Sequence, residues 1–136
     1  MILKTHHSIN ESLCGKVIHT EEGKAEVWFH TSAAMIADEH GLIHGGFLFG
    51  AADYAAMAAV NDPNVVLGAS EVKFLAPVRH GQTVLFRAEV TQQKGKKRVV
   101  TVTGECDGVK VFEGSFTALV LQKHVLEASR SSKLLK

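Results

Sequence analysis

The feature that most constrains this sequence is a single charge inside an otherwise apolar segment. Residues 45–60 read GGFLFGAADYAAMAAV, and Asp53 is the only charged residue among them. A sixteen-residue segment that is apolar on every side predicts a buried helix. We expect this helix to stop at Asn61, because the run Asn61-Asp62-Pro63 ends a helix and begins a turn. A carboxylate in such a helix is costly to bury, so it needs a partner, water or a chemical role.

Two interpretations of Asp53 follow from this cost. In the structural one, the carboxyl group is bonded to a backbone or hydroxyl group across an interface. In the functional one, it is a general base or a nucleophile whose pKa is raised by its surroundings. Structural ion pairs perturb pKa values as catalytic groups do, so the residue type alone leaves both interpretations open.

The predicted start of the helix offers a place for a ligand. Gly45 and Gly46 follow His44 there, and glycines allow a ligand to approach the free backbone N–H groups of a helix start. The helix dipole favours negative charge at the same place, so the oxyanion of a thioester or ester under attack would be stabilised. Close packing at a tight turn would explain the glycine pair equally well. Combined with Asp53 two turns further on, however, the segment indicates an acyl-transfer site.

Basic residues gather at one turn, with Lys94, Lys96, Lys97 and Arg98 close together. A solvated turn is the simpler interpretation. The alternative is a contact with the phosphates of a nucleotide-bearing substrate, for which Arg79 in the loop after Pro77 is a second candidate.

Metal binding is not expected. His40 and His44 stand four residues apart, but Gly41 lies between them and argues against a regular helix. Neither a third ligand nor an HExxH pattern is visible in the sequence.

The rest of the chain carries strand signals. Apolar and polar residues alternate on both sides of turn sequences such as Glu22-Gly23 and Asp107-Gly108, which indicates hairpins. Two strands, one buried helix and four further strands predict an α+β protein with an antiparallel sheet wrapped around a helix. The expected strands lie in residues 16–31 (two strands), 65–75, 83–93, 98–106 and 109–121. We expect an N-terminal arm over residues 1–15, one domain over 16–122 and a tail over 123–136 that contains a weak amphipathic helix.

Composition excludes several classes of protein. The chain has 136 residues, of which 46% are hydrophobic and 21% charged, as in one globular domain. A net charge of +1 gives no reason to expect binding to nucleic acid or to a membrane surface. The longest charge-free stretch, 41–52, is shorter than the roughly 18 apolar residues of a membrane span, so no membrane insertion is expected. Cys14 and Cys106 fit free thiols, and the N-terminal residues do not resemble a signal peptide, so we expect a cytoplasmic protein.

Two segments resemble a known family. Residues 44–61 resemble the signature helix of hotdog-fold acyl-CoA thioesterases of the phenylacetic-acid-degradation (PaaI-like) type, with HGG, an aromatic residue, an alanine-aspartate pair, small residues and an asparagine. Residues 69–84 are similar to the family's strand, which ends in an F-L-x-P element followed by a glycine-containing turn. The resemblance extends over roughly residues 13–121.

The resemblance implies a hotdog fold and hydrolysis of an acyl-CoA thioester, with no cofactor apart from the coenzyme A of the substrate. It also implies a homodimer, or a homotetramer, whose active site lies at the subunit boundary. Asp53 would activate water or attack the carbonyl carbon, the N–H of Gly45 or Gly46 would polarise the carbonyl group, and His44 would help to hold the thioester. The candidate substrate contacts are Phe49, Asn61, Arg79, Lys97 and Arg98.

A second branch of the same fold provides an alternative. FapR-type regulators of lipid synthesis bind acyl-CoA or malonyl-CoA without cleaving it, and a neutral residue replaces the acid. This chain retains Asp53, and the segment before Lys16 is too short for the helix-turn-helix of those regulators, so we expect the enzyme. One departure from the family pattern is the run Gly50-Ala51-Ala52, which is smaller than the leucine-containing sequence often found there. It indicates either a wider acyl tunnel or a binding role without catalysis.

Overall fold

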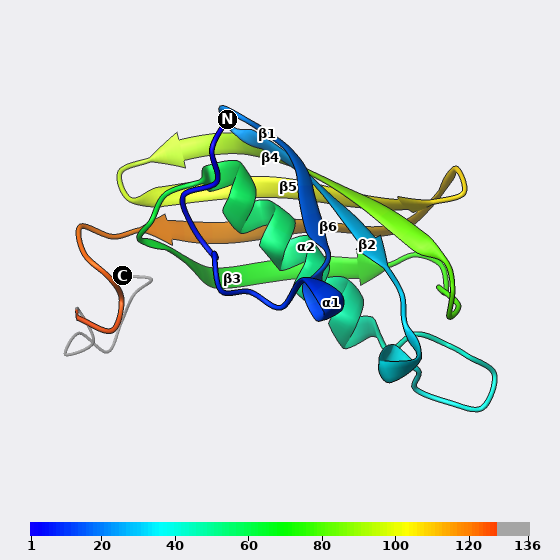
Figure 1. Cartoon of the computed structure of the whole chain (residues 1–136). Helices are drawn as coiled ribbons and strands as arrows, with labels where there is room; N and C mark the ends of the chain where they lie inside the picture. The colour runs from blue at the N-terminus through cyan, green and yellow to red at the C-terminus, as the bar shows by residue number, and fades with distance from the viewer. Residues whose placement is uncertain (128–136) are drawn as a thin grey trace.

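The computed structural model of the chain describes residues 1–127, which form a curved antiparallel sheet with one long helix, α2 (Gly45–Val60), lying across one face (Figure 1). The strand order in the sheet is β1-β2-β4-β5-β6-β3. The strands are β1 (Lys16–Glu21), β2 (Lys24–His30), β3 (Val65–Phe74), β4 (Thr83–Lys94), β5 (Lys97–Cys106) and β6 (Val109–Val120). Two short helices, α1 (Glu11–Cys14) and η1 (Ala33–Met35), precede α2. The predicted α+β class and the hotdog fold are confirmed.

Helix α2 has the bounds that the sequence predicts. Asn61 follows its last residue and adopts the left-handed conformation, with φ 53° and ψ 49°. Asparagine tolerates this conformation better than most residues, so it ends the helix without a glycine. The Asn61 N–H still donates to the Met57 carbonyl oxygen over 2.8 Å, which closes the last turn.

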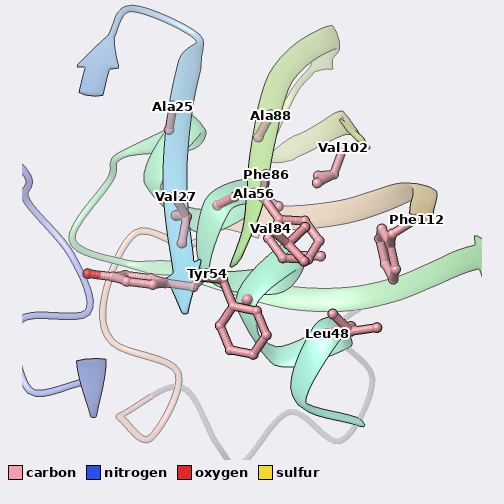
Figure 2. Close-up of a cluster of buried hydrophobic side chains, with 14 of the residues drawn as sticks. Ala25, Val27, Leu48, Tyr54, Ala56, Val84, Phe86, Ala88, Val102 and Phe112 are labelled. Carbon is pink, nitrogen blue, oxygen red and sulfur yellow. The ribbon is translucent and has the colours of Figure 1, made fainter. Parts of the chain in front are cut away.

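The core lies between α2 and the inner face of the sheet. Alanines occupy most of the helix positions that face the strands, so the large side chains of this core come mainly from the sheet. Figure 2 shows Leu48 and Ala56 of α2 close to the strand residues Phe86 and Phe112. Gly104 of β5 makes room for this packing, because a Cβ there would lie 2.7 Å from the Phe86 ring.

Three hairpins, β1–β2, β4–β5 and β5–β6, order the sheet, as the turn sequences indicate. Gly23 joins β1 to β2 with φ 76°, and Asp107 and Gly108 join β5 to β6 with φ 50° and 78°. At Asp107 and Gly108, both central residues have a positive φ, which is the geometry of a two-residue type I′ turn and matches the twist of the paired strands.

Strand β3 forms the edge of the sheet beside β6, and α2 does not cover its outer half. Ser70 and Phe74 are exposed, and the Phe74 side chain remains 52% accessible although it lies on the sheet face that carries the helix. An edge strand with free backbone groups and uncovered apolar side chains is a surface suited to pairing with another strand.

The ends of the chain differ in how far they are described. Residues 1–14 run beside α2 (Figure 1), and Leu3, Ile9, Leu13 and Cys14 pack against the core. The helix expected within residues 123–136 falls largely outside the described residues, and residues 123–127 contain no helix. No helix within residues 1–127 is long and apolar enough to cross a membrane.

Candidate functional site

Helix α2 turns one narrow face away from the sheet. Gly46, Gly50 and Asp53 lie on this face, because residues three and four apart in a helix are neighbours on the same side. All three are at least partly accessible, whereas the rest of the helix is mostly buried. A Cβ added at Gly50 would meet no atom within 4 Å. Open space therefore lies beside the helix, one turn before Asp53.

One oxygen of the Asp53 carboxyl group, Oδ1, is buried and has no hydrogen-bond partner within residues 1–127. Burial raises the pKa of this carboxyl group from 3.8 to about 6. Within the described chain, no hydrogen bond to Oδ1 explains why an acid is buried at this position. The remaining interpretations are that Asp53 acts on a ligand or contacts a second subunit. A carboxyl group with a pKa near 6 is well suited to general base catalysis close to neutral pH.

The start of α2 presents free N–H groups. The two preceding residues are held in place, because the Ile43 N–H donates to the Val78 carbonyl oxygen and the His44 N–H donates to that of Met35, each over 2.9 Å. Within the described chain, no side chain caps this helix start. The N–H groups of Gly45 and Gly46 belong to the first turn and have no acceptor inside the helix. Together with the helix dipole, they favour an oxygen that carries negative charge.

Two rings flank these N–H groups. A Cβ at Gly46 would lie 3.1 Å from the ring of His44, and one at Gly45 would lie 3.2 Å from the ring of Phe74. Both glycines therefore allow the rings to lie against the helix start. This places the His44 imidazole beside the N–H groups where the sequence predicts that the thioester is held.

Asp53 and the start of α2 are well separated within a single chain. Gly46 and Asp53 are seven residues apart on α2, which corresponds to about 10 Å along the helix axis. The attacking nucleophile and the oxyanion donor must each lie about 3 Å from the same reacting carbonyl group. Within one chain, the two parts of the predicted site therefore lie about two helical turns apart.

The five candidate substrate contacts lie in different places. Phe49 packs against Phe116 of β6, with their ring centroids 5.6 Å apart. Arg79 lies near the helix start, since it forms an isolated bridge with Leu42. The side-chain amide of Asn61 is engaged by the N-terminal residues, because it accepts from the Lys4 N–H and donates to the Ile2 carbonyl oxygen. Because both groups of this amide already have partners in the N-terminal residues, the structure does not show Asn61 free to contact a substrate, and that contact stays a prediction.

Lys97 and Arg98 lie at the opposite end of the helix from Arg79. A small groove of about 190 Å³ is lined by Val60, at the end of α2, and by Arg98. A helix of this length extends about 24 Å, so the two basic regions of one chain are far apart. The Arg98 guanidinium donates to the carbonyl oxygens of Gly95 and Lys97 over 2.7 and 3.2 Å, and so also stabilises its own turn.

One neighbour of Asp53 was missed by the sequence interpretation. Cys14 of α1 lies close enough to Asp53 for the carboxylate to raise the pKa of the thiol, in addition to the larger effect of burial. The spacing of Ile9 and Leu13 would have indicated that α1 has an apolar side, and both residues pack against the core. No local pattern, however, shows where a one-turn helix docks.

Other parts of the described surface do not suggest a second centre. Residues 1–127 contain no group of three histidine, cysteine, aspartate or glutamate side chains that could hold a metal ion. Two shallow grooves, of about 430 and 620 Å³, are lined by strand residues such as Thr101 and Thr103. Asp53 lines neither groove, so the larger hollows do not coincide with the candidate site.

The matched family is the thioesterase superfamily, over residues 40–113. This range contains the helix start, Gly50 and Asp53, and it covers more than half of the chain. The protein belongs to the thioesterase superfamily, and the resemblance inferred from residues 44–61 is confirmed.

Three solved structures show the range of its relatives. An uncharacterized protein from Pyrococcus horikoshii is 47% identical, covers 93% of this chain and 97% of its own, and superposes with a TM-score of 0.91. The PaaI protein from the phenylacetic acid degradation operon of E. coli is 28% identical, over 80% of this chain and 85% of its own, with a TM-score of 0.73. A hypothetical thioesterase from Streptococcus pneumoniae, solved with coenzyme A, is 19% identical over 80% and 87% of the chains, with a TM-score of 0.73; it shows the fold alone.

Two curated relatives have names that do not refer to a thioesterase. A methylthioribose-1-phosphate isomerase from Aquifex aeolicus is 50% identical over 121 residues, which make up 89% of this chain and 26% of that protein. The transcription factor FapR from Caldanaerobacter subterraneus is 25% identical over 120 residues, which make up 88% of this chain and 60% of that protein. The chain thus spans about a quarter of the first relative and less than two thirds of the second.

Proposed function

We propose that this protein hydrolyses an acyl-CoA thioester to a free acid and coenzyme A. The observation that carries the proposal is Asp53, whose buried Oδ1 atom has no hydrogen-bond partner within the described chain and whose pKa is raised to about 6. Membership of the thioesterase superfamily supports this chemistry, as does the likeness to PaaI.

In the proposed reaction, Asp53 of one subunit acts on a thioester held at the helix start of another. The carboxylate takes a proton from a water molecule while the water oxygen attacks the carbonyl carbon. The negative charge on the carbonyl oxygen is stabilised by the N–H groups of Gly45 and Gly46. When the carbon–sulfur bond breaks, the proton passes to the leaving sulfur and the acid is released. Direct attack by Asp53, followed by hydrolysis of the resulting anhydride, is the alternative route to the same products.

The proposed assembly is a homodimer formed through the edge strand β3, with a homotetramer as its larger form. The about 10 Å between Gly46 and Asp53 on one helix supports a shared site. If the two α2 helices lie antiparallel, Lys97 and Arg98 of one copy come to the end of the other copy that carries Arg79. The phosphates of coenzyme A would then bind basic residues from two chains. A cytoplasmic location, where acyl-CoA is made and used, is part of the proposal.

A thiol-release assay over short, long and aromatic acyl-CoAs tests the activity. We expect the wild type to release coenzyme A from at least one class and Asp53→Asn to lose at least 100-fold in kcat, as general base catalysis usually contributes that much. Asp107→Asn is the matched control, because Asp107 is exposed in a turn where asparagine is also favoured. The proposal fails if the wild type releases no thiol, or if Asp53→Asn retains full activity.

Binding of acyl-CoA without cleavage is the second candidate function. The likeness to the transcription factor FapR over 88% of this chain supports it. The resemblance to FapR-type regulators implies binding of acyl-CoA without hydrolysis. Calorimetric titration with an acyl-CoA, together with the thiol-release assay, separates the two functions. Tight binding without thiol release by the wild type would establish the second function, and release abolished by Asp53→Asn would exclude it.

A further inference from the structure

The N-terminal arm, residues 1–14, lies against α2 on the side that carries the candidate site. Its apolar side chains Leu3, Ile9, Leu13 and Cys14 pack against the hydrophobic core. Thr5 is buried, with 6% of its surface exposed. The arm therefore forms part of the packed structure, and its helix α1 packs on α2.

Asn61 ties the arm to the end of α2. Its side-chain Oδ1 accepts a hydrogen bond from the Lys4 N–H over 2.6 Å, and its Nδ2 donates to the Ile2 carbonyl oxygen over 2.8 Å. The amide thus pairs with the arm backbone as a neighbouring strand would. The left-handed conformation of Asn61 leaves its own N–H in the helix, so its side chain can serve the arm.

Further contacts hold the arm along the helix. The ring of His6 stacks on that of Tyr54, with a centroid distance of 6.2 Å and an interplanar angle of 29°. Figure 2 shows the Tyr54 side chain extending from α2 toward the dark blue arm. At the far side, the Thr20 hydroxyl donates to the Met1 carbonyl oxygen over 2.6 Å. The arm is therefore fastened both to the helix and to the neighbouring strand β1.

The end of the arm reaches Asp53. Helix α1, the last turn of the arm, packs on α2, and its Cys14 thiol is coupled electrostatically to the Asp53 carboxylate. Within residues 1–127, the Asp53 carboxylate adds to the effect of burial in raising the pKa of the Cys14 thiol, whereas no charged group shifts the pKa of Asp53 itself. His6, Tyr54 and Glu11 lie in the same contact between arm and helix, but the charge of Glu11 acts on Tyr54. Burial is thus the cause of the raised pKa of Asp53.

We propose that the N-terminal arm is a wall of the Asp53 site, and that Asn61 is a positioning residue that holds this wall in place. The inference rests on the proposed function and deepens it, because it assigns to this arm the shielding of the reacting carboxylate from bulk solvent. Asn61 would act on catalysis through the arm and not through contact with the substrate. Release of the arm would expose Asp53 to water and return its pKa toward the ordinary value.

The test uses two variants that loosen the arm at different atoms. Asn61→Gly removes the amide and keeps a residue that suits the left-handed conformation. Lys4→Pro removes the N–H that donates to Asn61 at a position whose side chain is exposed. Asn64→Gly is the matched control. The side-chain amide of Asn64 makes no hydrogen bond within the described chain, and its backbone N–H, which donates to the Asp62 carboxylate, is kept in the variant. Carbon-13 shifts of the Asp53 carboxyl group, assigned by their loss in Asp53→Asn, report its titration, and amide exchange reports release of the arm.

We expect faster exchange of the arm amides in both variants and a titration midpoint of Asp53 lowered by about 1 pH unit, roughly half of the shift that burial causes. The acidic limb of the kcat/KM profile should move by the same amount, while Asn64→Gly leaves both unchanged. The inference is overturned if the arm is released and the midpoint stays, or if the arm remains protected in both variants. The titration of the Asp53 carboxyl group can be measured whether or not the protein is active. Absence of thiol release would therefore refute the proposed function and leave the inference about the arm standing.

Discussion

Replacing Asp53 by asparagine should stabilise the protein at neutral pH while it abolishes hydrolysis. The pKa of this carboxyl group is about 6 in the folded protein, against 3.8 for an ordinary aspartate. Because the folded value is the higher one, the stabilising effect of the protonated form is fully present below about pH 4 and is lost as pH rises through 6. Above that range, the charged form costs about 3 kcal/mol at 1.36 kcal/mol per pKa unit. Asparagine has nearly the same shape and no charge, so it removes this cost.

Urea unfolding of the wild type and of Asp53→Asn at pH 7.5 and at pH 4 measures the effect. We expect the variant to be more stable by about 2–3 kcal/mol at the higher pH and nearly equal at the lower one. Both proteins must be compared at one concentration, because the stability of an oligomer depends on it. Asp107→Asn, at an exposed turn, should show no comparable dependence on pH. A variant that is less stable than the wild type at pH 7.5, or a difference that does not change with pH, would refute the reasoning.

Three further outcomes are expected. Gly50→Leu fills the open space beside Asp53, so thiol release from bulky acyl-CoAs should fall at least 10-fold with little change in thermal stability. A large drop in the melting temperature of the variant would contradict this prediction. Gly104→Ala places a Cβ 2.7 Å from the Phe86 ring, so urea unfolding should show a loss of about 1–3 kcal/mol, and unchanged stability would mean that the core yields freely. Sedimentation velocity at micromolar concentration should show a dimer or tetramer, whereas a folded, active monomer would exclude the shared site.

Much of the fold follows from local sequence patterns. The bounds of α2 are predicted because an apolar run ends at Asn61-Asp62-Pro63, where the chain can neither continue the helix nor remain extended. The hairpins are predicted because residues such as Gly23 and Gly108 adopt positive φ readily. These features depend on neighbouring residues, so they can be read without the three-dimensional structure.

The long-range arrangement could not be predicted in the same way. Strand β3 pairs with β6 and not with β4, its neighbour in sequence, because the other strands form a continuous antiparallel set. The two hydrogen bonds that join Asn61 to Ile2 and Lys4 connect residues almost 60 positions apart. No pattern of residues marks such a pairing, since any backbone segment can bind an amide side chain.

The candidate site was predicted in part. Asp53 was singled out because one acid in an apolar helix is costly to bury. That cost is visible in the structure as an unpaired carboxyl oxygen with a raised pKa. The contribution of Cys14 and the separation of Arg79 from Lys97 and Arg98 depend on how distant segments pack, so the sequence did not reveal them. Roles in catalysis or binding for the individual site residues remain predictions.

The shared site is tested most directly by mixing two inactive variants. Asp53→Asn lacks the carboxylate, and Gly46→Val blocks the helix start, so neither should release thiol from an acyl-CoA by itself. In a mixed dimer, one site would combine the intact Asp53 of one chain with the intact Gly46 of the other. After random exchange of subunits, thiol release should recover to about a quarter of the wild-type rate, since half of the dimers are mixed and each has one intact site. No recovery in a sample shown to contain mixed dimers would contradict a site built by Asp53 of one chain and the helix start of another.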